Sequence, residues 1–371
     1  MSAGSPLRVA VLGAGGIIAR AIVRDLAESP EVAGLTLLDL DGERAAAVAR
    51  EQGGGRAVGG AVDGRVPGAL AAVLADCDVL VNSASYRINL DAMDAALAAG
   101  CHYLDLGGLY WMTARQLELH ERFEQAGLLA VLGIGSSPGK TNVMAVRAVR
   151  ALDGDAVERI DVCAASRDPG AGDDGALHVP YALVTLLDEI TLAPVVLRDG
   201  APVEIEPLHD GGEVEFPQPI GRVSTIHTLH SELLTFGTSF HCEQASFRLS
   251  LSDALLSRLR GLVGASPERV AQAAATALPQ SSRTVSAHVV TASTESRSVR
   301  VSALTVPHLG WGLGGGIVST ATPAAAAVRL LARGEIDARG VHPPEACIDP
   351  DNLFAELAPR GCTFAVLSSA R

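Results

Sequence analysis

Short apolar runs alternate with segments of helical periodicity along the first part of the chain. The runs, which are typical of strands buried on both faces, lie at residues 7–12, 34–39, 78–82 and 128–132. Between them, apolar residues recur every three or four positions, as in amphipathic helices. This alternation predicts a Rossmann domain over residues 1–137, with a doubly wound parallel sheet covered by helices on both faces. A glycine-rich stretch at 53–60 is expected to form a surface loop.

The pattern changes near residue 151, where runs rich in β-branched residues follow one another with few helices between them. The predicted strands lie at 161–165, 195–197, 203–205, 222–229, 242–250, 284–292 and 298–306. The predicted helices lie at 179–190, 253–262 and 268–277. We therefore predict an α+β substrate and dimerisation domain over residues 138–318, with a mostly antiparallel open sheet. Residues 319–371, with a helix opening at Thr322-Pro323, are expected to form a C-terminal helical segment that returns to the Rossmann domain.

Charge and composition narrow the class of partner. The 371 residues carry a formal net charge of −13, and no segment concentrates lysine and arginine, which excludes a nucleic-acid groove or an anionic membrane as partner. No apolar stretch reaches the ~20 residues of a membrane-spanning helix. Six scattered cysteines form no C-x-x-C pair and follow no secretory signal, which favours a reducing cytoplasm. The alanine-rich chain leads us to expect a homodimer.

A glycine turn follows the first predicted strand. Gly13, Gly15, Gly16 and Ile17 belong to a near match to G-x-G-x-x-G, in which Ile18 stands at the third glycine position. The first glycine permits a tight turn, and the second lets the backbone approach a pyrophosphate. The helix that follows offers free N–H groups to the phosphates. The turn therefore predicts a dinucleotide site.

Asp39 ends the second strand, where a carboxylate accepts hydrogen bonds from the ribose hydroxyls and repels a 2′-phosphate. NAD is therefore expected as cofactor, and NADP is less favoured. Arg44 is the counter-argument, because a nearby arginine can hold a 2′-phosphate. The loops after two further strands should line the ribose and the nicotinamide, since ligands lie beyond the carboxyl ends of parallel strands. These loops contribute Asn82, Ser83, Ala84 and Gly107.

Several motifs resemble the saccharopine dehydrogenase-like family. They include Ala-Gly-Cys-His-Tyr-Leu-Asp at 99–105 and Gly-Ser-Ser-Pro-Gly-Lys-Thr-Asn at 135–142, together with blocks at 78–84 and 126–133. The segments at 219–232 and 334–345 are also similar. The segments at 82–89, 103–108 and 117–122 are most similar to bacterial lysine 6-dehydrogenases. The resemblance implies hydride transfer at a carbon bearing nitrogen, on an amino-acid-like or amine substrate. The helix at 179–190 lacks the arginine with which saccharopine reductases grip a substrate carboxylate, which argues against a saccharopine-sized substrate.

Three functions stay open on these grounds. The first is oxidative deamination of a lysine-type side-chain amine, or the reverse reaction. The second is an opine-type reductase that forms or splits a secondary amine, as with saccharopine or carboxynorspermidine. The third is a non-catalytic NAD-binding regulator. Release of ammonia would separate the first from the second.

Candidate site residues in the N-terminal half follow the family motifs. Asp105 matches a substrate-contact position and could hold a substrate ammonium, or it could cap a turn. Lys140, the only lysine of the chain, could bind a carboxylate or act as a base if burial lowers its pKa; otherwise it is a solvent-exposed residue. Asn142 could bind a substrate carboxylate or contact the start of its own helix. Tyr86 could cover the nicotinamide.

The second domain offers a further group of candidates. His227 and His230 could carry protons near neutral pH, and Arg222, Ser231 and Glu232 could bind the substrate. Ordinary structural roles are the alternative for each histidine. Zinc would need neighbours such as His241 and Cys242, but no spacing there matches a metal pattern, so no metal is expected. The loop around Trp311 could close as a lid or simply connect two elements.

Overall fold

The computed structural model describes residues 5–169 and 177–370, which form two compact units. Domain 1 comprises Met1–Val143 and Thr320–Leu357, and domain 2 comprises Met144–Ser319 and Ala358–Arg371. The division falls close to the predicted boundary at residue 137. The C-terminal segment expected at 319–371 is shared, because its last residues belong to domain 2.

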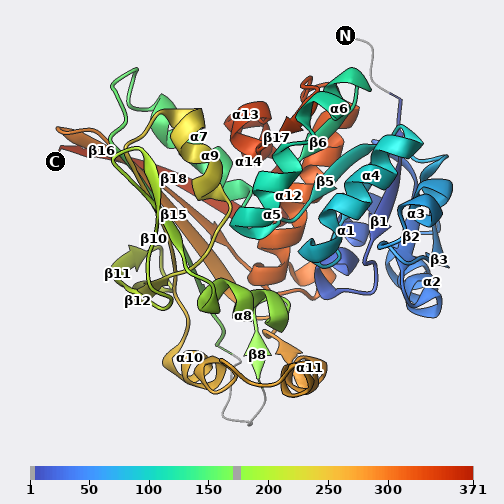
Figure 1. Cartoon of the computed structure of the whole chain (residues 1–371), viewed down its shortest axis with the longest axis horizontal. Coiled ribbons are helices and arrows are strands. Elements are labelled where there is room, and N and C mark those ends of the chain that lie inside the picture. The colour runs from blue at the N-terminus through green and yellow to red at the C-terminus, as the bar shows by residue number, and fades with distance from the viewer. Residues whose placement is uncertain (1–4, 170–176, 371) are drawn as a thin grey trace. The chain divides into compact units, whose positions relative to one another are not determined.

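Domain 1 is built on a parallel sheet of seven strands in the order β17-β6-β5-β4-β1-β2-β3 (Figure 1). The strands are β1 (Leu7–Leu12), β2 (Val32–Asp39), β3 (Ala57–Ala61), β4 (Val79–Asn82), β5 (His102–Asp105), β6 (Leu129–Val131) and β17 (Gly340–His342). The first six follow the order 3-2-1-4-5-6 of a Rossmann sheet, which confirms the predicted fold class. The carboxyl ends of β1 and β4 therefore meet at the point where the strand order reverses.

Helices accompany these strands, two of them (α7 and α12) continue from one domain into the other, and apolar side chains from both layers form the core. The helices are α1 (Ile17–Ala27), α2 (Gly42–Gln52), α3 (Pro67–Leu74), η1 (Tyr86–Ile88), α4 (Asn89–Ala99), α5 (Leu109–Leu117), α6 (His120–Gln125), α7 (Lys140–Arg150), α12 (Gly315–Ala332), α13 (Pro344–Cys347) and α14 (Pro350–Leu357). One cluster joins Leu80 and Tyr103 of the sheet to Met93 of α4 and Phe123 of α6. All four residues of β4 are buried, as expected for a central parallel strand.

The glycine-rich stretch at 53–60 is not entirely a loop. Its second half belongs to β3, which pairs with β2 from Leu35↔Ala57 to Asp39↔Ala61. A Cβ at Gly59 would lie 2.3 Å from the backbone nitrogen of Ala46, so α2 packs directly on the strand backbone. The glycine thus marks a close approach of two elements, and the expectation of a surface loop was wrong for residues 57–60.

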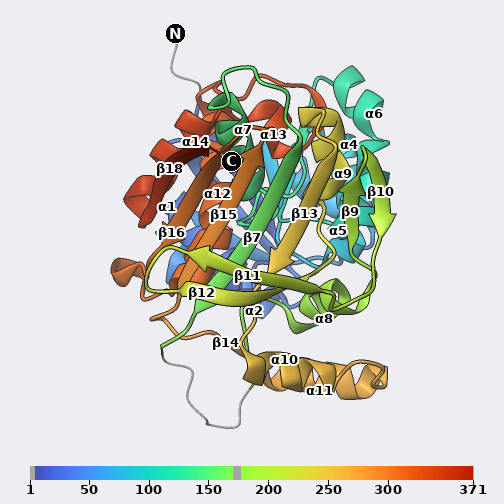
Figure 2. The same ribbon diagram turned by 90° about the vertical axis from the view of Figure 1, so that its left-hand side faces the viewer.

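Domain 2 holds a nine-stranded sheet with the path β10-β9-β13-β7-β15-β16-β18, from which the β11–β12 hairpin branches at β13 (Figure 2). Its strands are β7 (Arg159–Arg167), β9 (Val195–Arg198), β10 (Ala201–Glu204), β11 (Asp210–Phe216), β12 (Gly221–His227), β13 (Gln244–Leu249), β15 (Val285–Ser293), β16 (Arg297–Thr305) and β18 (Cys362–Ala370). Only the β13–β7 pair is parallel among these described strands, which confirms a mostly antiparallel sheet.

The remaining elements of domain 2 are short. They are β8 (His178–Val179), β14 (Leu278–Pro279), α8 (Leu183–Thr191), α9 (Glu232–Phe240), α10 (Asp253–Arg260), α11 (Pro267–Thr276), η2 (Leu309–Trp311) and η3 (Ala358–Arg360). The β11–β12 hairpin covers part of one sheet face, where Phe216 packs against Cys163 of β7 and Val289 of β15. Ser252 and Ser266 cap α10 and α11 by accepting backbone N–H groups, as serines at helix starts do.

The end of the chain departs from the helical segment expected there. Residues 362–370 form β18, which pairs antiparallel with β16 along its whole length. The run Cys-Thr-Phe-Ala-Val-Leu-Ser-Ser-Ala has no helical period, and its threonine, phenylalanine and valine favour a strand. The helix expected from Thr322-Pro323 begins earlier, at Gly315, with Pro323 in its interior.

Among the described residues, one helix is long and apolar enough to cross a membrane. It is α12, and 83% of this segment is buried inside the protein. Core helices of soluble proteins share this length and composition, so α12 is weak evidence for a membrane span.

Candidate active site

The glycine turn links β1 to α1 at the carboxyl edge of the domain 1 sheet. Gly13 adopts φ +76, a left-handed conformation that suits glycine, and a Cβ there would lie 2.8 Å from the backbone of Ala84. The turn is therefore in direct contact with the loop after β4. Gly16 is the N-cap of α1, and neither a side-chain cap nor an acidic residue occupies the first turn. The N–H groups at the start of α1 are thus available to an anion.

The Asp39 carboxylate lies beside this turn. Its Oδ2 accepts a hydrogen bond from the Gly15 N–H at 2.9 Å, and its Oδ1 accepts one from the Asp41 N–H at 3.1 Å. A Cβ at Gly15 would meet the Arg44 side chain at 2.2 Å, so the arginine lies across the turn. The sequence-predicted residues Gly13, Gly15, Gly16, Ile17, Asp39 and Ala84 are therefore brought together at one edge. This arrangement fits the pyrophosphate and ribose of a dinucleotide.

Asn82 reaches away from the turn and into a buried polar network. Its Nδ2 donates to Asn89 Oδ1 at 3.0 Å and to the Tyr103 hydroxyl at 3.1 Å, while its Oδ1 accepts from the Ala84 N–H at 3.1 Å. Asn82 is 2% exposed. The side chain thus fixes the loop that contains Ser83 and Ala84, and it presents this loop to the glycine turn.

Asp105 is the centre of that network. Its Oδ2 accepts from Gln116 Nε2 at 2.6 Å, from the Tyr103 hydroxyl at 3.0 Å and from Asn89 Nδ2 at 3.1 Å. Its Oδ1 accepts from the N–H groups of Gly107 at 2.9 Å and Gly133 at 2.7 Å. Burial raises the pKa of this carboxyl, and the donors oppose that rise.

A carboxylate has about four lone-pair sites. Five donors therefore leave no direction for a substrate ammonium, and the network gives Asp105 a positioning role. It fixes the loop after β5 through Gly107 and the loop after β6 through Gly133. Between these two glycines lies the Pro138 ring, which a Cβ at either position would meet at 2.7–2.8 Å.

The turn before α7 holds the other family-motif residues. Asn142 Oδ1 accepts from the Gly139 N–H at 2.8 Å, and its Nδ2 donates to Glu345 Oε2 at 2.7 Å. The oxygen and the nitrogen of the Asn142 amide therefore both have hydrogen-bond partners within domain 1. The bond to Gly139 is the contact at the start of its own helix that we gave as the alternative to substrate binding. Lys140 is 1% exposed, so the alternative of a solvent-exposed lysine was wrong. A buried ammonium requires polar partners, so the position of the Lys140 side chain is fixed by the groups around it.

In domain 2, His230 lies between two glutamates. Its Nδ1 is 3.2 Å from Glu232 Oε2, its Nε2 is 3.7 Å from Glu189 Oε2, and its ring stacks on Phe247 at 3.5 Å between centroids. Glu189 also accepts a hydrogen bond from the Tyr181 hydroxyl. Burial disfavours the imidazolium, but the two carboxylates raise the His230 pKa to about 9. His230 is therefore protonated at neutral pH and forms a buried ionic cluster with Glu189 and Glu232, next to Ser231, the N-cap residue of α9.

His227 and Arg222 do not join this cluster. His227 is the register partner of Arg248 on β13, so both side chains lie on the sheet face opposite to Phe247. Arg222 is 68% exposed and lies 3.5 Å from Glu215 of the neighbouring strand. In domain 1, Tyr86 is half-buried in η1, with the Arg87 guanidinium 4.8 Å from its ring centroid. Among the described residues, no group of three or more histidine, cysteine, aspartate or glutamate side chains could hold a metal ion.

Sequence reasoning missed the residues that partner these groups. Asn89 and Gln116 complete the Asp105 network, and Glu189 completes the His230 cluster. All three are buried polar residues on helices, and the other buried positions are apolar on α4 and α8 and are Tyr110 and Thr113 on α5. A polar residue at a core-facing helical position is the signal that could have found them.

Comparison with known proteins defines the class of domain 1. Residues 9–131 match the family model described as the saccharopine dehydrogenase NADP binding domain. The predicted dinucleotide-binding domain of this chain is therefore similar to that of the saccharopine dehydrogenase family, in agreement with its motifs.

Two curated relatives extend the comparison. Carboxyaminopropylagmatine dehydrogenase of Synechocystis is 29% identical over 205 residues, which is 52% of this chain and 49% of that protein. Carboxynorspermidine synthase of Vibrio alginolyticus is 32% identical over 108 residues, which is 26% of this chain and 25% of that protein. The chain thus matches about half the length of the first relative and a quarter of the second.

Solved structures confirm the fold over the whole chain. Saccharopine dehydrogenase (L-Glu forming) from Saccharomyces cerevisiae has a TM-score of 0.71 at 15% identity, covering 98% of this chain and 100% of its own. Homospermidine synthase from Legionella pneumophila, in complex with NAD, has a TM-score of 0.75 at 11% identity, covering 98% and 91%. At these identities the likeness shows the fold alone.

Proposed function

We propose that this chain is an NAD(P)-dependent dehydrogenase or reductase that transfers hydride at a carbon–nitrogen bond of an amine substrate. One observation carries the proposal: the open glycine turn, the Asp39 carboxylate and the loop after β4 meet at the carboxyl edge of a saccharopine dehydrogenase-like domain. When bound, a nicotinamide cofactor supplies or accepts the hydride. The N–H groups of α1 would hold its pyrophosphate, and Asp39 its ribose.

We favour NAD as the cofactor. The two carboxylate oxygens of Asp39 each accept one backbone hydrogen bond, so each keeps a lone pair for a ribose hydroxyl. The same negative charge would repel a 2′-phosphate. The position of Arg44 across Gly15 argues for NADP, as does the description of the family model. Comparing NADH with NADPH at equal concentration decides between them.

For the substrate, we favour secondary-amine chemistry over lysine deamination. Both curated relatives are named for carboxylated polyamine derivatives. The segments most similar to lysine 6-dehydrogenases contain Asn82, Asn89, Tyr103 and Asp105, whose side chains form the buried network. At these four positions the resemblance therefore reflects how the loops are held and not which substrate is bound.

The proposed reaction has two steps. An amine and a carbonyl compound condense to an imine and release water, and hydride from NAD(P)H with one proton then gives the secondary amine and NAD(P)⁺.

Among the predicted residues, we propose Lys140 for proton transfer or carboxylate binding. It is buried and follows the loop beyond β6, at the sheet edge where ligands bind in this fold class. His230, held as an imidazolium by two glutamates, is better suited to fix charge than to shuttle protons.

Tyr86, Ser231 and Glu232 stay our candidates for substrate contact, and we expect a cytoplasmic homodimer.

The experiment is a panel of amines, each supplied with NADH and a keto acid or aldehyde, with NADH consumption and ammonia followed together. We expect NADH consumption only when amine and carbonyl are both present. Reduction of NAD by lysine with release of ammonia would instead establish the oxidative deamination. Cofactor binding without turnover of any pair of amine and carbonyl compound would favour the non-catalytic NAD-binding regulator.

Lys140 is tested in the same assay. Lys140→Met keeps the length of the side chain and removes its charge, and we expect kcat to fall by at least about 100-fold. The matched control is Arg150→Met, which removes a positive charge from the exposed end of the same helix and should retain most activity. Equal activity of Lys140→Met and the wild type would remove Lys140 from the mechanism.

A further inference from the structure

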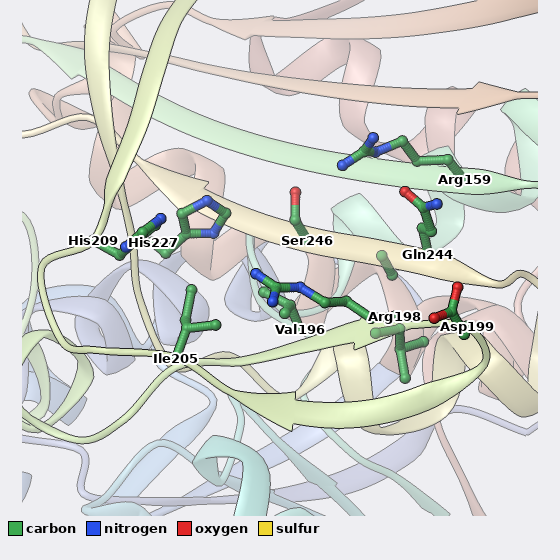
Figure 3. Close-up of a pocket in the computed structure, with 11 residues that line it drawn as sticks. Arg159, Val196, Arg198, Asp199, Ile205, His209, His227, Gln244 and Ser246 are labelled. Carbon is green, nitrogen blue, oxygen red and sulfur yellow. The ribbon is translucent and has the colours of Figure 1, made fainter.

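Domain 2 contains a cavity of about 290 Å³ bordered by β7, β9, β12 and β13 (Figure 3). A neighbouring cavity of about 390 Å³ shares three of its lining residues, Arg159, His227 and Ser246. Volumes of this size are typical of small-molecule sites. Figure 3 shows polar side chains reaching into the space from several strands.

The cavity is separate from the His230 cluster. Side chains alternate along β13, so Gln244, Ser246 and Arg248 share one face of the sheet and Phe247 lies on the other. Gln244 and Ser246 line the cavity, whereas Phe247 stacks on His230. The cavity therefore lies across the sheet from His230, and it needs its own explanation.

The lining carries more positive than negative charge. Together the two cavities include Arg159, Arg198 and Arg248 against Asp161 and Asp199, in a protein whose net charge is −13. Asp161 accepts from Ser246 Oγ at 2.6 Å and lies 3.1 Å from Arg159 Nε and 3.9 Å from Arg248 Nη2. One carboxylate is thus shared between two arginines and a serine.

Several of these polar groups lack a full set of partners. Arg248 donates from Nη1 to the Gly211 carbonyl at 2.8 Å, but its buried Nε has no hydrogen-bond partner. The buried Nδ1 of His227 has none either. Within the described part of the chain Arg198 forms no ion pair, and Figure 3 shows its guanidinium pointing toward the side of the cavity where His227 lies.

We propose that this cavity binds a small anion with a carboxylate or phosphate group, held by the guanidinium groups of Arg198 and Arg159 beside the imidazole of His227. The planar guanidinium forms paired hydrogen bonds with both kinds of anion. Burial, together with the nearby Arg248 and His209, lowers the His227 pKa to about 4. The ring is therefore neutral at pH 7, so the positive charge for the anion comes from the arginines.

The test is isothermal titration calorimetry with inorganic phosphate and, separately, succinate, at constant ionic strength set with chloride. The protein is saturated with NAD, so that the glycine turn of domain 1 is not available to the anion. We expect one site per chain, and Arg198→Gln should weaken binding by at least about 10-fold, the value of one charge-assisted hydrogen bond. Arg260→Gln, at an exposed position of α10 that lines neither cavity, should leave binding unchanged.

A second readout reports on the cavity itself. In a histidine-selective NMR titration, phosphate should raise the pKa of His227, because a bound anion favours the imidazolium. Absence of binding at millimolar anion, or equal binding to the wild type and Arg198→Gln, would overturn the proposal. The wild type could also be a dimer that binds no anion, while Arg198→Gln is a monomer. This result would show that the cavity receives a carboxylate from a second copy of the chain. That result would also overturn it.

Discussion

The Asp105 network in domain 1 and the arginine cavity in domain 2 are both polar clusters inside a folded domain, but they are partnered differently. Asp105 accepts five hydrogen bonds and is 1% exposed. In the cavity, one aspartate serves two arginines, and the buried Nδ1 of His227 has no partner. The first cluster is complete within the chain, whereas the second has capacity for a further group.

This difference separates residues that hold the fold from residues that can bind a ligand. A buried polar group whose hydrogen bonds are all made within the protein stabilises one arrangement of loops. A group with unused hydrogen-bonding capacity costs free energy unless a ligand or water completes it. Asp39 lies between these cases, because its oxygens accept only one hydrogen bond each. Substitutions should therefore destabilise the protein most in the complete cluster and least in the open one.

The largest effect is expected for Asp105→Ala. The change leaves five donors without their acceptor, three of them on buried side chains, so the free energy of unfolding should fall by about 3–5 kcal/mol. Urea unfolding at pH 7 measures it. The control is Asp94→Ala, whose exposed carboxylate pairs with Arg122 at 2.8 Å and should cost less than about 1 kcal/mol. Similar losses in the two variants would contradict the assignment of Asp105 as the centre of the network.

The next effect concerns His230 and depends on pH. Its folded pKa of about 9 lies above the unfolded value near 6.5. The resulting stabilisation is complete below pH 6.5 and is lost as the pH rises toward 9, and it amounts to about 3 kcal/mol. Urea unfolding between pH 6 and 9 should therefore show a decline in the wild type.

The matched variants isolate this histidine. His230→Gln should be less stable at pH 6.5 and should lose the part of the decline that His230 contributes. His241→Asn keeps a residue that tolerates the φ of +52 found there, and it should follow the wild-type profile. If His230→Gln declines as steeply as the wild type, the imidazolium is not the source of the pH dependence.

A smaller effect is expected for Asp39→Asn. Loss of the negative charge should reduce the preference for NADH over NADPH by about 10–100-fold, the value of a charge-assisted hydrogen bond. The ratio of kcat/KM for the two cofactors measures it. A wild-type enzyme that already prefers NADPH would give the selecting role to Arg44, and Arg44→Ala should then reduce that preference.

The smallest effect on stability is expected for Arg198→Gln. This exposed guanidinium forms no ion pair among the described residues, so the free energy of unfolding should change by less than about 0.5 kcal/mol. The same variant should lose anion binding. A loss of stability near that of Asp105→Ala would mean that Arg198 supports the fold, which would remove the contrast between the two regions.

The fold was predictable wherever the pattern is local. Buried strands, the glycine turn and Asp39 at the end of β2 follow from short-range signals, and the strand order confirmed them. β18 was missed because its role depends on pairing with β16, some 60 residues earlier in the chain. Most of β3 was missed because glycines in a row usually indicate a loop. In this fold, Gly59 of the strand allows α2 to pack directly on the strand backbone.

The site was less predictable because the partners of each residue come from other elements. Asp105 was expected to contact substrate, but Asn89 and Gln116 reach it from α4 and α5. His227 and His230 are three residues apart and were grouped as proton carriers. The structure places them on opposite faces of the sheet, because β12 ends at His227 and the chain then turns before α9. Only the sheet register reveals such a separation.

Isotope transfer from the cofactor is the most direct test of hydride transfer to a carbon bonded to nitrogen. The enzyme is incubated with an amine, a carbonyl compound and NADH carrying deuterium at both C4 positions, and the product is analysed by mass spectrometry and NMR. We expect a secondary amine with one deuterium on the carbon attached to nitrogen, with water and NAD⁺ as the other products. A product that carries deuterium on a carbon bearing oxygen, as in an alcohol, would contradict it.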